Sequence, residues 1–323
     1  MLDAAALAAE GGPSPPPETQ GLLDRLDAWR EAMDFAAFGE DDAYVRWVEA
    51  GPRNVTFGAS PIDVGPILKE NLYSALKAAV LTSATLTVGG TFGYFLGRMG
   101  LGTAARCLRL ESPFRHEEQG LLFVPSRFPQ PQSEDFLPEA VAAVRRLLHA
   151  SGGRAFVLCT SFKNMRAVAE ALEDLPWPLL VQGQEPKGLL LERFREAGDA
   201  VLVATSSFWQ GVDVQGEALS LVVLDKLPFA VPSDPLTRAR IERIRREGGE
   251  PFSEYQLPSA AILLQQGVGR LIRSTRDRGV VACLDVRLRQ KGYGKVILAS
   301  LPAFPLTDRL EDVEAFFGHP AGG

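Results

Sequence analysis

The sequence has few of the residues that build metal centres or disulfide frameworks. Its 323 residues include only three cysteines and three histidines. Cys107, Cys159 and Cys283 are far apart and form no Cys-x-x-Cys motif, so neither a disulfide framework nor a zinc or iron–sulfur site is predicted. The histidines are equally dispersed, which leaves metal catalysis without a ligand set. Cys159 and Cys283 lie within apolar runs, so we expect both to be buried.

A strong positive charge and a long hydrophobic run are also missing. The net charge of −6 argues against a protein that coats DNA, because such proteins are basic overall, but it leaves room for a narrow basic channel. No apolar run reaches the roughly 18–20 residues of a membrane span. The alanine-rich start lacks the basic region of a signal peptide. A cytoplasmic protein without a membrane segment is therefore expected.

Strand and helix patterns alternate along the chain after Pro61. Short apolar runs predict buried strands, and amphipathic stretches predict helices between them. The expected strands are 79–81, 107–110, 121–124, 155–159, 179–181, 200–204, 219–224 and 280–284. The expected helices are 67–78, 138–150, 164–175, 189–196, 235–247 and 259–273, preceded by a helix at 19–38 and a strand at 41–49. This order predicts an α/β fold with a mainly parallel sheet flanked by helices, in which ligands bind beyond the carboxyl ends of the strands.

Polar clusters follow several of these strands. Ser83 and Thr85 follow the strand at 79–81. Thr160 and Ser161 follow the strand at 155–159 and open a helix, where free backbone N–H groups and hydroxyls suit a phosphate. Ordinary N-capping by Ser, Thr or Asn is the alternative for each cluster.

A third cluster, at 205–213, places two aromatic residues among small polar ones. Single-stranded nucleic acid is held in this way, because rings stack on bases while hydroxyls touch phosphates. The alternative is that Phe208 and Trp209 belong to the core.

The most informative segment is 266–273, which reads Q-G-V-G-R-L-I-R and has the spacing Q-x-x-G-R-x-x-R. Near the end of a helix, Arg270 and Arg273 would lie on one face, with Gly269 clearing the backbone beside them. Two guanidiniums in this arrangement suit a polyphosphate, because arginine binds phosphate bidentately. A solvated basic helix end is the alternative. The five arginines between 238 and 246, by contrast, spread around their expected helix and favour a solvated surface.

In sequence, order and spacing, these clusters resemble motifs III to VI of the XPD/DinG-type helicases of superfamily 2. Residues 81–86 resemble motif III, 156–162 motif IV, 207–216 with 224–229 motif V, and 266–273 motif VI. The tail at 284–295 is also similar to the DinG branch. The resemblance covers about residues 61 to 323. It implies a RecA-like domain of the P-loop NTPase superfamily, and a motor that couples ATP hydrolysis to translocation on single-stranded DNA in repair or replication.

The resemblance also implies roles for individual residues, in three groups. The catalytic group would reach the γ-phosphate of ATP across a cleft between two lobes: Arg270, Arg273 and Gln266. The nucleotide-coupling group would link the state of the nucleotide to the other lobe and to the DNA: Gly211, Asp213, Gly269, Ser83 and Thr85. The DNA-binding group would touch the strand: Thr160, Ser161, Ser207 and Trp209.

Two parts of the family pattern are missing from this sequence, namely the P-loop G-x-x-x-x-G-K-[ST] and the Asp-Glu-x-His motif that holds magnesium. We therefore expect residues 1–50 to be a flexible Pro-rich segment and a small helical remnant of the insertion domain. Residues 51–100 would be the edge of the first RecA-like lobe, and 101–323 the second lobe. ATP and Mg²⁺ would be shared with a P-loop-bearing N-terminal lobe, encoded upstream or on a separate chain. This chain alone would hydrolyse little ATP.

The sequence departs from the family pattern in two further ways, at the iron–sulfur cluster of the first lobe and in motif V. The four-cysteine cluster of many relatives is missing, so no iron–sulfur cluster is expected in this chain. Gln210 stands where the family usually has Glu.

Other functions are open at this point. A non-catalytic module that kept the second lobe would bind single-stranded nucleic acid in a salt-dependent way, without any effect of nucleotide. A nucleotide-sugar-type α/β enzyme could use the arginines for a donor diphosphate, but it has no reason to carry motifs III and V. A degraded gene fragment is a further alternative.

Overall fold

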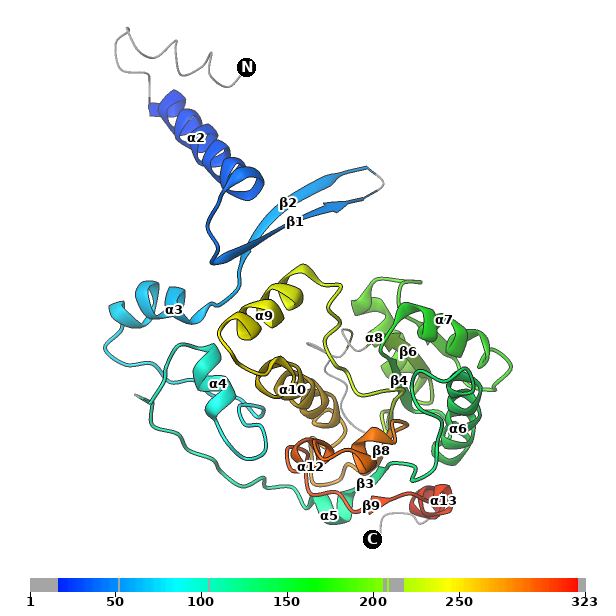
Figure 1. The fold of residues 1–323 in the computed structure, drawn as a ribbon. Coiled ribbons are helices and arrows are strands. Elements are labelled where there is room, and N and C mark those ends of the chain that lie inside the picture. Colours follow the sequence, from blue (N-terminus) through cyan, green and yellow to red (C-terminus); the bar gives the residue numbers. More distant parts are fainter. Residues whose placement is uncertain (1–16, 52, 104, 206–207, 209–217, 319–323) are drawn as a thin grey trace, which may run out of the picture.

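The structure is a computed structural model that describes residues 17–51, 53–103, 105–205, 208 and 218–318. Its centre is a seven-stranded sheet of order β5-β6-β4-β7-β8-β3-β9, in which every strand pairing is parallel (Figure 1). The strands are β3 (Gly120–Phe123), β4 (Ala155–Cys159), β5 (Leu179–Val181), β6 (Val201–Thr205), β7 (Leu221–Leu224), β8 (Gly279–Cys283) and β9 (Leu306–Thr307). The predicted parallel α/β sheet is confirmed.

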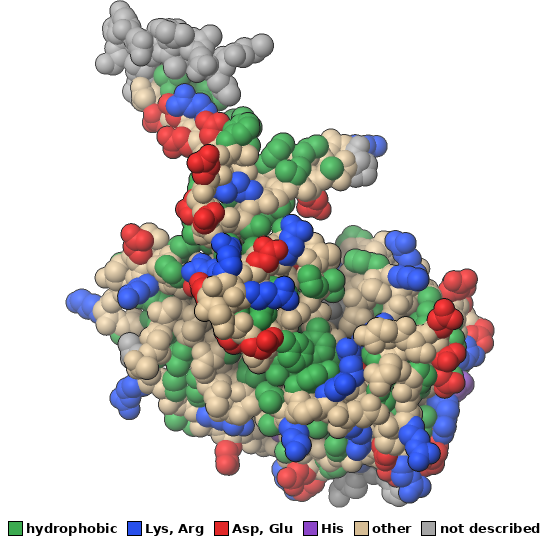
Figure 2. Space-filling model, viewed as in Figure 1, with side chains coloured by type: hydrophobic (Ala, Val, Ile, Leu, Met, Phe, Trp, Pro, Cys, Tyr) green, Lys and Arg blue, Asp and Glu red, His purple; other side chains and the backbone are tan. Residues whose placement is uncertain are grey.

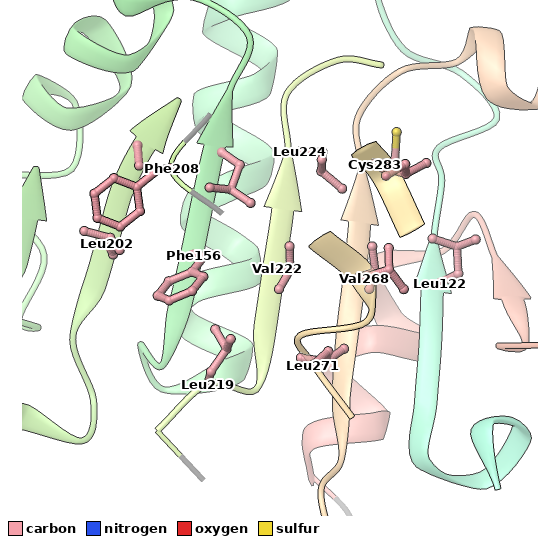
Figure 3. Close-up of a cluster of buried hydrophobic side chains, with 14 of the residues drawn as sticks. Leu122, Phe156, Leu202, Phe208, Leu219, Val222, Leu224, Val268, Leu271 and Cys283 are labelled. Atoms are coloured by element: carbon pink, nitrogen blue, oxygen red, sulfur yellow. The ribbon is translucent and has the colours of Figure 1, made fainter. Parts of the chain in front are cut away.

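Helices cover both faces of this sheet. One layer contains α8 (Lys187–Ala197), α10 (Leu257–Val268) and α12 (Gly294–Leu298), and the other contains α6 (Phe136–Ser151), α7 (Phe162–Glu170) and α13 (Leu310–Gly318). Successive strand residues point to opposite layers, so all residues of a short apolar strand are buried. In β4, Phe156 joins the α10 layer and Val157 joins the α6 layer. Figure 3 shows Phe156 and Val222 on adjacent strands, and both side chains belong to the core on the α10 side of the sheet.

The cysteines follow this burial pattern. Cys159 and Cys283 are buried at the ends of β4 and β8, as the sequence predicts, whereas Cys107 is exposed. Among the described residues, no helix is both long and apolar enough to cross a membrane.

The N-terminal part forms an arm that projects from the sheet domain (Figure 1). It consists of α2 (Pro17–Phe38) and an antiparallel hairpin of β1 (Tyr44–Ala50) and β2 (Val55–Pro61). The hairpin includes residues on both sides of the domain boundary expected at residue 50. The rings of Phe35 and Tyr44 meet edge to face at 4.9 Å, and Arg46 Nε donates to the carbonyl of Phe35 at 3.0 Å. Figure 2 shows hydrophobic side chains on the outside of this arm. The helix and the strand expected before Pro61 are confirmed.

Residues 62–101 are fastened to the sheet domain at three points. This segment contains α3 (Gly65–Asn71), a 3₁₀ turn (Tyr73–Ala75) and α4 (Gly93–Arg98). Arg240 Nε on α9 (Pro235–Arg246) donates to the carbonyl of Ile62 at 3.0 Å. The hydroxyls of Tyr94 and Ser259 are 2.7 Å apart, and the Gly89 N–H donates to Ser300 Oγ at 2.8 Å. The remaining elements are α5 (His116–Gln119), a π-helical turn (Phe252–Gln256) and α11 (Arg287–Gln290).

Two predicted strands and the lengths of three helices are wrong. Residues 79–81 and 107–110 have no regular secondary structure and pair with no strand in the described part of the chain. Val80 is 90% exposed, and Leu108 and Leu110 are 76% and 77% exposed. A strand that is apolar on both faces needs neighbouring strands and covering helices, and the described residues supply neither. The helix expected at 67–78 stops at Asn71, that expected at 164–175 stops at Glu170, and that expected at 259–273 stops at Val268.

Candidate functional site

The two arginines of motif VI lie beyond the end of α10. The helix ends at Val268, and Gly269 caps it by donating its N–H to the carbonyl of Gln265 at 2.8 Å. The next N–H groups, of Arg270 and Leu271, bond only three residues back, at 3.1 Å each, which tightens the chain into a turn. The expectation that Arg270 and Arg273 share one helical face is therefore wrong. Both are half-buried residues of the loop that leads to β8.

Asp277 accepts the hydrogen bonds that hold this loop in place. Its Oδ2 accepts the N–H groups of Arg273 and Ser274, each at 2.8 Å, and its Oδ1 accepts the Ser274 hydroxyl at 2.8 Å. An N–H that donates to a carboxylate cannot also make a helical hydrogen bond, so the helix expected to run to Arg273 does not include that residue. The same bonds fix the backbone of Arg273.

Gln119 holds the loop from the other side. This side chain, on α5, is only 7% exposed. Its Nε2 donates to the carbonyls of Ser274 and Asp277 at 2.8 and 2.9 Å, and its Oε1 accepts the N–H of Arg115 at 2.9 Å. The sequence reasoning missed both Gln119 and Asp277. The spacing of Ser274 and Asp277 is that of a side-chain-capped turn and could have indicated the second, whereas Gln119 carried no local signal.

The guanidinium groups can accept an anionic partner. Arg270 Nε is buried and has no hydrogen-bond partner among the described residues. Burial lowers the pKa of Arg273 from its usual value, and the nearby Asp277 carboxylate opposes this shift. Gln266 is half-buried one turn earlier, near the end of α10. A half-buried guanidinium with an open donor suits a phosphate, because a charge-assisted hydrogen bond would satisfy it.

A buried carboxylate ties together the ends of β4 and β7. Asp225 is 5% exposed, and its Oδ1 accepts the N–H of Thr160 at 2.8 Å. Its Oδ2 accepts Asn164 Nδ2 at 2.9 Å and the Thr160 hydroxyl at 3.3 Å. Burial raises the pKa of Asp225, while the hydrogen bonds from Asn164 and Thr160 oppose the shift. Ser161 Oγ caps α7 by accepting the Asn164 N–H at 3.1 Å, so its capping role is confirmed and its contact with DNA stays a prediction.

Asp285, fully buried beyond the end of β8, fixes the loop that follows β7. It accepts the Leu227 N–H at 3.0 Å and Arg287 Nη2 at 2.6 Å. This pair raises the pKa of Arg287, whose guanidinium also lies 5.5 Å from the ring centre of Phe229.

The ends of β5 and β6 are joined in a similar way. Gln182 Oε1 accepts the N–H and the hydroxyl of Thr205 at 2.7 and 2.9 Å. Together with Asp225 and Asp285, these side chains form a row of strand-end polar groups along the carboxyl edge of the sheet.

The other predicted site residues are only partly described. Ser83 and Thr85 form a small turn, in which the Thr85 N–H donates to Ser83 Oγ at 3.2 Å. The remaining ones lie outside the described residues: Ser207, Trp209, Gly211 and Asp213. Phe208 is 4% exposed, so the core alternative is confirmed for this ring. Within the described ranges, no group of three His, Cys, Asp or Glu side chains could hold a metal ion.

The partly buried ring of His116 on α5 is expected to make the free energy of unfolding depend on pH. Its ring contacts Phe304 at 5.6 Å, and burial lowers its pKa below the ordinary value. His116 therefore takes up a proton more readily in the unfolded chain than in the folded one. The free energy of unfolding is expected to keep its maximal value above about pH 6.5 and to fall as the pH drops below it. His116→Gln is expected to flatten this fall, measured by urea unfolding at about pH 7.5 and about pH 5.5. Equal flattening by His149→Gln, at an exposed histidine, would contradict this assignment.

Known proteins match this chain over most of its length. A family model described as "Helicase C-terminal domain" matches residues 144–304. The chain is 44% identical over 300 residues to the ATP-dependent DNA helicase YoaA of Escherichia coli K12, covering 93% of this chain and 47% of the relative. It is 38% identical over 296 residues to the ATP-dependent helicase DinG of Mycobacterium tuberculosis H37Rv, covering 89% and 44%. The chain thus spans about half the length of the curated relatives it matches.

Solved structures share the fold at lower identity. An XPD structure in its apo form superposes with a TM-score of 0.63 at 15% identity, over 90% of this chain and 59% of that chain. Xpd4 of S. tokodaii gives a TM-score of 0.56 at 16% identity, over 94% and 56%. The chain belongs to the XPD/DinG-type helicases of superfamily 2, and it corresponds to roughly the C-terminal half of its DinG and YoaA relatives.

Proposed function

We propose that the chain is the second motor lobe of an ATP-dependent DNA helicase that acts in the cytoplasm in DNA repair or replication. It would couple ATP hydrolysis to translocation on single-stranded DNA. The observation that carries this proposal is the arginine loop, defined as residues 269–277, which is held by Asp277 and Gln119 and leaves Arg270 Nε without a partner among the described residues. The names of YoaA and DinG, which are ATP-dependent helicases, support the same assignment.

The arginine loop suits the chemistry of phosphoryl transfer. Negative charge spreads over the phosphoryl oxygens in the transition state, and a positioned guanidinium stabilises it. Arg270 and Arg273 would supply that charge, and Gln266 would orient the same site. When bound, ATP would supply the phosphoryl group and Mg²⁺ would supply positive charge that stabilises the transition state. The described residues offer no metal-holding group, so the ligands of Mg²⁺ are assigned to the P-loop-bearing lobe.

The loops that follow β4 and β6, at the carboxyl edge of the sheet, would contact the DNA. Thr160 is fixed to Asp225 through both its N–H and its hydroxyl, which gives the loop before α7 a defined conformation. Hydroxyls and helix N-termini are common partners of phosphates, and they read no sequence. Thr160, Ser161, Ser207 and Trp209 are the proposed contacts, and Gly211, Asp213, Gly269, Ser83 and Thr85 the proposed coupling residues.

Reconstitution of ATPase activity tests the proposal. The purified chain alone is expected to hydrolyse almost no ATP, because the groups that cradle the β- and γ-phosphates are missing from it. Mixing it with the N-terminal half of E. coli YoaA, the part of that relative that this chain does not cover, is expected to give hydrolysis that oligothymidine stimulates. Vigorous hydrolysis by the chain alone would refute the need for a second lobe.

The non-catalytic module has a different signature in the same assay. It predicts salt-dependent binding of oligothymidine by the chain, no stimulated hydrolysis in the mixture, and no change of DNA affinity when ATP is added. Comparing oligothymidine with oligouridine in the mixture decides between DNA and RNA.

A further inference from the structure

We propose that Arg127, Lys291 and Lys295 form a basic strip that binds the phosphate backbone of single-stranded DNA beyond the ends of β3 and β8. The strip extends the row of strand-end polar groups across the sheet. This inference rests on the proposed function, because it requires the strand to cross this edge.

Hydrogen bonds bring the three residues into one region. β3 and β8 are parallel neighbours, so the segments that follow them leave the sheet side by side. Arg289 Nε donates to the carbonyl of Val124 at 2.7 Å, and Gln130 Nε2 donates to Gln290 Oε1 at 3.3 Å. Arg127 lies between the two bonded positions of one segment, and Lys291 directly follows those of the other.

The base of the strip is rigid. Tyr293 lies between the two lysines in sequence, and its ring packs against Phe252 and Phe229 at 5.1 and 5.7 Å. Lys295 follows in the first turn of α12. Lys226 Nζ donates to the carbonyl of Pro131 at 3.1 Å, which ties the segment after β3 to the end of β7. The lysines are therefore presented from a fixed backbone.

The three cations of the strip differ from the other cations around them. Arg287 is neutralised by Asp285, while Arg289 and Lys226 donate to backbone carbonyls. The three side chains of the strip are exposed, and none makes an ion pair or a hydrogen bond within the part of the chain that the structure describes: Arg127, Lys291 and Lys295. On a chain of net charge −6, three uncompensated cations in one region form a local attraction for a polyanion.

The ligand class follows from the shape of this charge. Exposed cations on separate segments suit successive phosphates of an extended strand better than a small, compact anion. Each phosphate that such a cation neutralises releases bound counterions, so the affinity for single-stranded DNA falls with salt by a slope of about 0.7 per contact. The strip would bind without regard to sequence.

Fluorescence anisotropy of the full chain with a labelled oligothymidine of about 16 nucleotides tests the strip. Binding is measured between about 25 and about 300 mM KCl for the chain and for the triple variant Arg127→Ala/Lys291→Ala/Lys295→Ala. The variant is expected to lose about 2 units of the salt slope and about 10²–10³-fold in affinity at low salt, with an unchanged unfolding midpoint.

A matched control removes the same charge elsewhere. Arg25→Ala/Arg53→Ala/Lys69→Ala changes three exposed cations of the arm and α3, and it is expected to keep the slope of the unmodified chain. If the chain binds with a salt dependence that the strip variant leaves intact, the strip is refuted while the proposed function stands. If the chain shows no salt-dependent binding of oligothymidine even at low salt, the proposed DNA contacts fail and the strip fails with them.

Discussion

Arg270→Ala is expected to lower the oligothymidine-stimulated ATP hydrolysis of the reconstituted motor by about 10³–10⁵-fold, the range over which an arginine finger contributes to phosphoryl transfer. The effect should fall on kcat, because the charge that the guanidinium meets develops in the transition state. Arg270 Nε is buried without a partner in the described residues, so this donor is already out of water before ATP arrives, although the residue as a whole is half-buried. A charge partly shielded from water stabilises the transition state more strongly than one in bulk solvent.

Arg276→Ala is the matched control for this effect. Arg276 lies in the same loop but is exposed, and its loss should leave hydrolysis nearly unchanged. Arg270→Lys keeps the charge but loses the planar fork, so it is expected to recover only part of the rate. An Arg270→Ala motor that hydrolyses ATP at a normal rate would show that the arginine loop does not reach the phosphate.

Asp285→Ala is expected to lower the free energy of unfolding by about 3–5 kcal/mol, the usual cost of breaking a buried ion pair from one side. The carboxylate is fully buried, and its loss would leave the Arg287 guanidinium and the Leu227 N–H without their partner. The loop after β7 should loosen first, because Asp285 is its link to β8. Urea unfolding of the purified chain, followed by circular dichroism, measures the change.

Asp174→Ala offers a comparison with the same chemistry at the surface. Asp174 binds Arg145 through two oxygens, at 2.6 and 2.7 Å, but its side chain is 68% exposed. Water solvates both partners of an exposed pair once it is broken, so the loss of stability should be much smaller. Equal losses in the two variants would mean that burial does not set the strength of the Asp285–Arg287 pair.

The sequence predicted the sheet well because burial on two faces leaves a plain signal. The runs at 155–159 and 179–181 are strands with the expected bounds, because each is apolar throughout and a polar residue follows it directly. The same signal failed at 79–81 and 107–110. A sequence records that a residue such as Val80 suits a sheet, but the described residues contain no strand beside it.

The candidate site was predictable by residue type but not by geometry. The spacing of Arg270 and Arg273 indicated a functional pair, yet it implied a helix that Gly269 and Asp277 interrupt. Asp277 acts through backbone N–H groups next to it in sequence, whereas Gln119 acts from 155 residues away and leaves no local pattern. Long-range support of this kind follows from the tertiary fold, which single-sequence patterns do not encode.

Only one of the three cysteine thiols is exposed, so the chain has a single site for thiol-specific labelling. Burial raises the pKa of Cys283 to about 12 and also raises that of Cys159, so neither offers a reactive thiolate near neutral pH. Cys107 is exposed, one residue before the exposed Leu108. A maleimide dye would therefore attach at one position without any substitution of the natural sequence. That position adjoins the exposed Leu108 and Leu110, which nothing in the described part of the chain covers, so the dye would report directly when another protein surface closes over them.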